Sequence, residues 1–77
     1  MREDKIRENL YWIARKSNGN RFSGGDISLD DVTIFLESIM MVGLAGLPID
    51  KIAEAIIEHD TDGSAELWLD VTAKSIY

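Results

Sequence analysis

Apolar residues recur every three or four positions in the first half of the chain, and this spacing predicts two helices there. The first runs from about Glu3 to Lys16, with Tyr11 and Trp12 flanking an apolar stripe formed by Ile6, Leu10, Ile13 and Ala14. A stretch rich in glycine, asparagine and serine follows and favours turns. Ser28 and Asp31 then resemble a capping box that opens a second helix from about Leu29 to Gly43.

A third helix follows Pro48, a residue that suits a first helical turn because its missing N–H group would lack a partner there anyway. This helix runs to about Glu58. One face carries the apolar residues Ile49, Ile52, Ala53 and Ile56, and the other carries the acidic residues Asp50, Glu54 and Glu58. The separation predicts a helix with one buried and one exposed face.

The last segment, Ala65 to Tyr77, fits two structures. Its apolar and polar residues alternate, which is typical of a half-buried strand, but such a strand needs a partner near Phe22 to Ile27 or in a second subunit. The other possibility is a fourth helix with Asp62 or Ser64 as N-cap and with inward-facing residues Leu67, Trp68 and Val71. The predicted fold is therefore mainly α: one domain, residues 1–77, with a three-helix core and a C-terminal helix or strand.

The second helix is apolar in nearly every direction, and only Thr33, Glu37 and Ser38 form a thin polar strip. A helix of this kind must be covered on all sides. Two amphipathic helices and a short tail are too few to cover it, so we expect the chain to form a homodimer. The expected self-association surface consists of Ile34, Leu36, Met40 and Met41.

Charge is unevenly distributed along this chain of 77 residues, whose net charge is −6. Residues 1–21 carry a net +3 and residues 22–77 a net −9. The acidic part should repel nucleic acid, which argues against direct nucleic-acid binding even though Tyr11 and Trp12 lie among basic residues. It favours a protein partner with a basic surface, and the acidic face at Asp50, Glu54 and Glu58 is the expected contact.

The sequence also limits the compartment and the chemistry. It has no cysteine, no pattern typical of a signal peptide and no apolar run of the length a membrane span requires, so we expect a cytoplasmic protein without membrane contact. His59 is the only histidine, no nucleophile stands beside it, and no glycine-rich phosphate loop is present. We therefore expect neither enzymatic activity nor a cofactor.

The stretch from His59 to Asp70, HDTDGSAELWLD, places acidic and hydroxyl residues two positions apart beside a glycine. With a helix on each side of Asn20–Asp31 and of Asp60–Val71, the chain resembles an EF-hand pair. In the first loop Gly25, Ile27 and Asp31 match that family's turn glycine, buried aliphatic residue and closing carboxylate. In the second, the resemblance implies a calcium site with four oxygen ligands: Asp60, Asp62, Ser64 and Glu66.

Both loops also depart from the EF-hand pattern. Val71 stands where the second loop should close with a carboxylate, Ala65 replaces its turn glycine, and Phe22 and Gly24 replace oxygen donors in the first. A polar turn in which aspartate binds its own backbone is the simpler interpretation. The sequence thus predicts a non-enzymatic, acidic, homodimeric module that binds and modulates, or inhibits, a protein partner. The alternative is an EF-hand-like cation-binding module.

Overall fold

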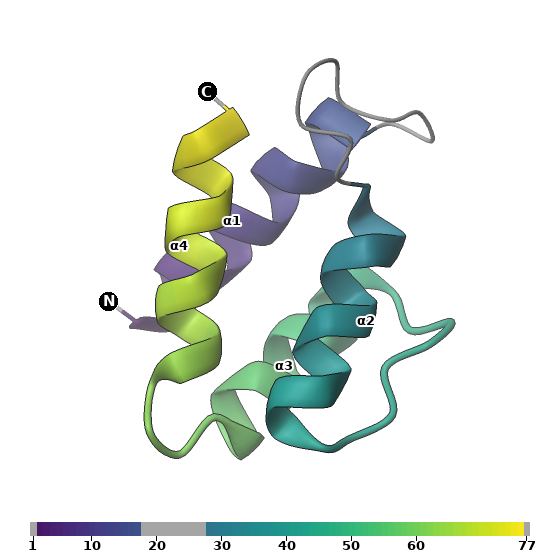
Figure 1. Ribbon diagram of the computed structural model, residues 1–77, viewed down its shortest axis with the longest axis vertical. Helices are drawn as coiled ribbons and strands as arrows, with labels where there is room; N and C mark the ends of the chain where they lie inside the picture. The colour runs from purple at the N-terminus through teal and green to yellow at the C-terminus, as the bar shows by residue number, and fades with distance from the viewer. Residues whose placement is uncertain (1, 18–27, 77) are drawn as a thin grey trace.

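The computed structural model describes residues 2–17 and 28–76, and these ranges form four helices (Figure 1). They are α1 (Arg2–Ser17), α2 (Leu29–Met40), α3 (Ile49–His59) and α4 (Ser64–Ile76). The described ranges contain no strand, and none of their helices combines the length and apolar character needed to cross a membrane. The mainly α prediction is confirmed.

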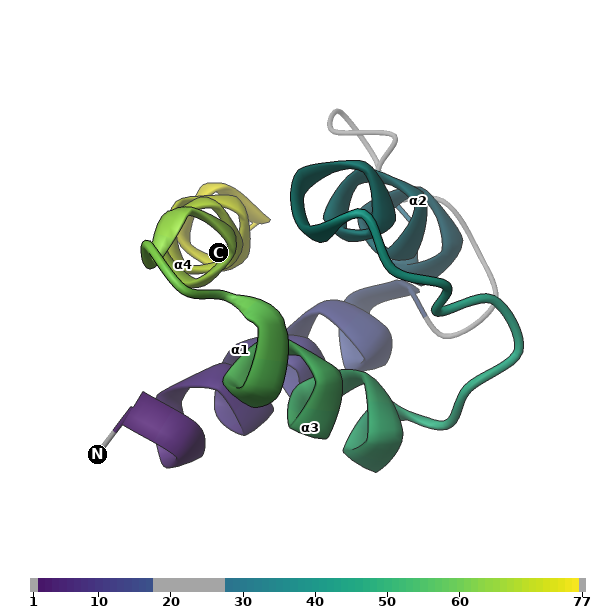
Figure 2. The same ribbon diagram turned by 90° about the horizontal axis from the view of Figure 1, so that it is seen from below.

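The helices lie in two layers. Seen from below, α2 and α4 form one layer and α1 and α3 the other (Figure 2). Helices α1 and α2 each contact all three other helices, but the most extensive contacts are those that α1 makes with α4 and α3. Helix α1 is therefore the element around which the others are arranged.

The core lies between these layers and draws on every helix. Its buried apolar residues are Ile6, Leu10 and Ile13 of α1, Val32 and Leu36 of α2, Leu44 of the next connection, Ile52, Ala53 and Ile56 of α3, and Ala65, Leu69 and Ala73 of α4. The stripes expected for α1 and α3 are confirmed at Ile6, Leu10, Ile13, Ile52, Ala53 and Ile56, which helical spacing places on one inward face. Ile49 is half-buried against the core, and Ala14 is half-buried outside it.

The C-terminal segment is a helix, so the strand alternative is wrong. Its inward face also differs from the expected one, since Leu67 is 66% exposed, Val71 is 57% exposed and Trp68 is half-buried. The buried positions are instead Ala65, Leu69, Thr72 and Ala73. Ala65 and Ala73 flank Leu69 on the inward face and let α4 lie close to α1, whereas Leu67 and Val71 point outward.

Helix α2 begins as expected and ends earlier than expected. The capping box is confirmed: the Ser28 hydroxyl accepts from the Asp31 amide and the Asp31 carboxylate accepts from the Ser28 amide. The predicted end at Gly43 is wrong, because Met41 has the left-handed φ of 57° and its N–H donates to the Glu37 carbonyl. This turn lets Leu44 enter the core, where it is 1% exposed.

We predict that Met41→Gly stabilises the monomeric fold. A side chain at positive φ is unfavourable where glycine is not, and the Met41 side chain is 89% exposed, so its removal loses little packing. Urea unfolding should show a gain of about 0.5–1 kcal/mol in the free energy of unfolding. Met40→Gly, within the last helical turn, is the control and should destabilise. A Met41→Gly protein less stable than the unmodified chain would contradict this account.

Candidate interaction surfaces and the turn that organises them

The carboxylate of Asp60 is buried at the turn between α3 and α4, with 1% of its side chain exposed. Its Oδ1 accepts a hydrogen bond from the Ala65 amide and its Oδ2 accepts one from the Glu66 amide, each at 3.0 Å. These amides belong to the first turn of α4, where backbone N–H groups have no partner within the helix. Asp60 therefore joins the end of α3 to the start of α4.

Arg2 brings the start of α1 to the same turn. Its guanidinium donates to the backbone carbonyls of Ile57 and Asp60, at 3.4 and 3.2 Å, and its Nη2 lies 3.4 Å from Asp60 Oδ2. Its Nε also donates to Glu66 Oε1 at 2.6 Å. A single side chain from the first turn of α1 thus holds the end of α3 and the start of α4.

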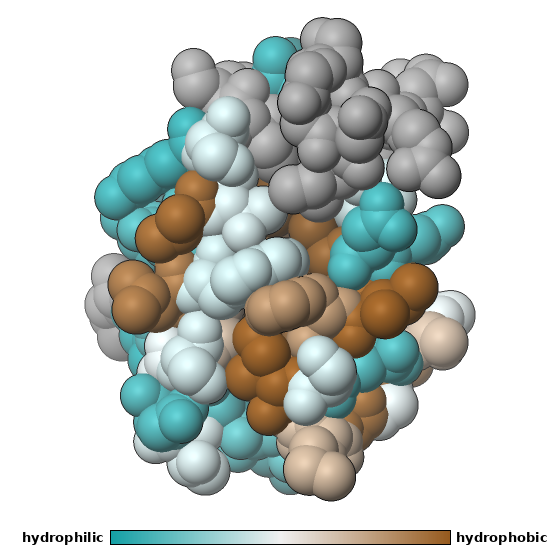
Figure 3. Space-filling model, viewed as in Figure 1, coloured by the Kyte–Doolittle hydropathy of each residue, from teal (hydrophilic) through white to brown (hydrophobic). Residues whose placement is uncertain are grey.

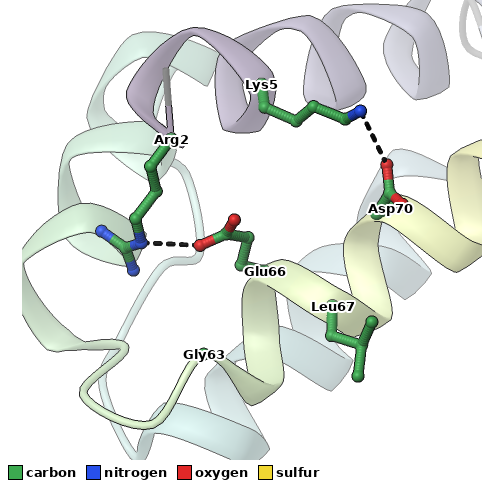
Figure 4. A pocket seen from close by; sticks show the side chains of 6 residues that line it. All are labelled: Arg2, Lys5, Gly63, Glu66, Leu67 and Asp70. Atoms are coloured by element: carbon green, nitrogen blue, oxygen red, sulfur yellow. Dashed lines mark hydrogen bonds and ion pairs between the residues drawn. The ribbon is translucent and has the colours of Figure 1, made fainter.

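A hollow of about 560 Å³ lies beside this network, between α1 and α4. In Figure 4, Arg2 points toward Glu66 and Lys5 points toward Asp70 across it. Asp70 additionally pairs with Lys74 at 3.0 Å. The charges of the hollow are therefore balanced within the chain, and their role here is to fasten α1 to α4.

The expected calcium ligands are engaged with other parts of the chain. Asp60 and Glu66 face Arg2, and Asp62 Oδ1 accepts from both the amide and the hydroxyl of Ser64. In the ranges that the structure describes, no three acidic or histidine side chains gather as a metal ion would require. Of the first predicted loop, Asn20 to Asp31, residues 20–27 lie outside the described residues; Asp31 belongs to the capping box of α2.

The acidic residues expected to meet a partner, Asp50, Glu54 and Glu58, all lie exposed on α3. Asp50 Oδ1 accepts a hydrogen bond from the Tyr11 hydroxyl at 2.9 Å, and this bond, with the nearby negative charge, raises the pKa of Tyr11 above its ordinary value of 10.0. Glu54 lies 3.6 Å from the Lys51 ammonium. The structure keeps this acidic face accessible, with its first residue tied to α1.

The four residues expected to mediate self-association do not form one surface. Leu36 is fully buried, so its assignment to an exposed surface is wrong: α1, α3 and α4 cover this side of α2. Met40 is half-buried against the core. Ile34 and Met41 are 62% and 89% exposed, Ile34 in α2 and Met41 just after its end.

A different apolar surface spans α2 and α4. The rings of Phe35 and Trp68 stack across the two helices with centroids 4.4 Å apart, and Phe35 remains 44% exposed. Leu67 and Val71 are also exposed on α4, Leu67 next to Trp68 in the sequence and Val71 one helical turn beyond it. Figure 3 shows apolar residues over both helices, with paler residues between the two groups. We name these four residues, Phe35, Leu67, Trp68 and Val71, the α2–α4 face.

The part of this face that lies between α2 and α4 carries no charge, whereas Leu67 at its edge also lines the hollow with Glu66 and Asp70. Helical spacing places Ser64, Trp68, Val71 and Ser75 along the α4 side and Phe35, Ser38 and Ile39 along the α2 side, and all seven are uncharged. Sequence reasoning missed the face because it assigned the large apolar residues of α4 to the core. The spacing of Ala65, Leu69 and Ala73 was the signal that could have found it.

No protein-family model, no curated protein and no solved structure matches this chain. The surfaces are therefore interpreted from their own chemistry.

We predict that Asp60→Asn lowers the free energy of unfolding by about 2 kcal/mol, because it weakens a buried helix cap and leaves Arg2 without its buried charged partner. Chemical unfolding followed by circular dichroism measures the change. Asp62→Asn is the matched control: its carboxylate is exposed and binds only Ser64, so the loss should be smaller. Equal losses in the two variants would contradict the organising role of Asp60.

We also predict that low pH destabilises the fold. Hydrogen bonds from Ser64 lower the pKa of Asp62 below its ordinary 3.8, and the bond from Lys74 lowers that of Asp70. A carboxyl whose pKa falls on folding stabilises the fold above its unfolded pKa, and that stability is lost as pH drops through the folded pKa. The free energy of unfolding should therefore decrease from neutral pH to about pH 3. In Asp62→Asn the free energy of unfolding should decrease less over this pH range. An unchanged pH profile would contradict the contribution of Asp62.

Proposed function

We propose that the chain is a non-enzymatic protein-interaction module that forms a homodimer through the α2–α4 face and presents its acidic surfaces to a basic protein partner. The observation that carries the proposal is the uncovered apolar surface of two adjacent helices. Large apolar residues scattered singly on a surface are ordinary, but a contiguous apolar patch is typical of an interaction site.

The uncharged character of the face favours a second copy of this chain as its occupant. Each chain carries a net charge of −6, so two copies repel one another wherever their acidic residues meet. A contact through Phe35, Trp68 and Val71 brings no acidic side chain into its centre. A basic partner would gain nothing from its charge at such a face.

Because the domain is small, covering the α2–α4 face would add appreciably to its stability. A domain of 77 residues buries a limited fraction of its surface and has little stability in reserve. Covering one large apolar side chain contributes about 1.5–3 kcal/mol, and a two-fold contact covers each residue in both copies. Pairing would therefore stabilise each chain as well as join it to its copy.

The acidic residues of α3 suit the partner. Asp50, Glu54 and Glu58 lie on an exposed helix surface, and a row of like charges attracts a basic protein and accelerates its association. Binding of this kind can modulate the partner, and inhibits it where the partner's basic surface is itself functional.

We predict that the unmodified protein at tens of micromolar elutes with twice the 8.6 kDa mass of one chain in gel filtration coupled to light scattering. Val71→Glu should give folded monomers, because a two-fold contact receives the new charge twice. Leu47→Glu, a partly exposed apolar residue outside the face, is the control and should leave the dimer intact. A monomeric unmodified protein, or equal effects of the two substitutions, would refute the proposal.

A further inference from the structure

A second apolar surface lies on the other side of α2, where the connection from α2 to α3 passes alongside that helix (Figure 2). The helix and the connection enclose a groove of about 440 Å³. Leu44 and Ile52, exposed by 1% and 2%, contribute to its floor. Ile34 from α2 and Leu47 from the connection form its lips and are 62% and 40% exposed.

The carboxylate of Glu37 fixes the position of the connection relative to α2 and so the shape of the groove. Glu37 Oε2 accepts hydrogen bonds from the Leu44 amide at 2.6 Å and the Ala45 amide at 3.0 Å. These bonds tie the connection to α2 and fix the distance between the two lips. The groove is therefore part of the folded structure, with its walls joined by Glu37.

Within residues 2–17 and 28–76, the charged residues that line the groove are both acidic: Asp30 and Glu37 line it, and no lysine or arginine of these ranges does. Each of the other three hollows described on this protein is lined by at least one basic residue, among them Lys5, Lys74 and Arg15. An apolar floor beside unbalanced negative charge suits a ligand that is apolar at one point and positive next to it.

We propose that this groove receives an aliphatic side chain of the protein partner, from a segment that carries lysine or arginine beside that anchor. The inference rests on the proposed function in one respect, that the partner is a basic protein. It adds the position at which an aliphatic side chain of that partner binds. The aliphatic side chain covers Leu44 and Ile52 between the lips, and the basic residue lies next to Asp30 and Glu37. Burial of the anchor supplies affinity and the charge pair supplies orientation.

The same charges argue against other occupants. A second copy of this chain would have to bring its own net charge of −6 to an acidic groove. A nucleic acid would bring phosphates to Asp30 and Glu37. A basic peptide segment meets neither obstacle.

A library of random 12-residue peptides displayed on phage, selected against the intact chain, tests the proposal without a known partner. Selected peptides should be enriched in lysine or arginine next to leucine, isoleucine or methionine. The affinity of one such synthetic peptide is then measured by fluorescence anisotropy for three variants: Ile34→Ser in the groove, Leu67→Ser on the α2–α4 face, and Glu54→Lys with Glu58→Lys on α3. Ile34 and Leu67 are matched in exposure, at 62% and 66%, so both variants should fold, which melting curves verify.

Ile34→Ser should weaken peptide binding about tenfold, whereas Leu67→Ser should change it less than about twofold. If Ile34→Ser and the unmodified chain bind the peptide with equal affinity, the groove is not the binding site. If the α3 double variant alone then loses binding, the proposed function survives and only the location of the anchor is wrong. If the selected peptides lack basic residues, both the proposed role of the groove and the proposal of a basic partner are wrong. Dimerisation is decided separately, by the mass measurement.

Discussion

The buried carboxylate of Asp60 is the contact on which the arrangement of the other elements depends. It lies at the end of α3, accepts from two amides of the first turn of α4 and faces Arg2 from the first turn of α1, 58 residues away in the sequence. A buried carboxylate is stable only when its charge is compensated and its oxygens are hydrogen-bonded, and this geometry supplies both. Three helices are thereby joined at one point.

Both connections between consecutive helices after α2 are built in the same way. Asp60 accepts from the amides of Ala65 and Glu66, and Glu37 accepts from the amides of Leu44 and Ala45. In each case one carboxylate binds two successive backbone amides and fixes where the chain turns. The consequence differs on the two sides: the Asp60 turn directs α4 so that Leu67 and Val71 face outward, and the Glu37 turn contributes to the groove beside α2.

The sequence predicted the features that depend on neighbouring residues. The capping box at Ser28, the face of α3 and the apolar stripe of α1 follow from spacing within one helix, and the structure contains all three. It did not decide between helix and strand after Ala65, because Leu67, Leu69, Val71 and Ala73 alternate as a strand would. Asp60 stabilises the helix by accepting from two amides of its first turn, and its contact with Arg2 is too distant in sequence for a local pattern to reveal. The same holds for Leu36, which is buried where α1, α3 and α4 pack against α2.

The central claim is that a second copy of the chain covers the α2–α4 face. An isotope-filtered nuclear Overhauser experiment on a mixture of ¹³C-labelled and unlabelled protein observes contacts between copies directly. Intermolecular signals are expected between the methyl groups of Leu67 or Val71 in one copy and the rings of Phe35 or Trp68 in the other. Intermolecular signals confined to other surfaces, or none at concentrations of tens to hundreds of micromolar, would contradict this claim.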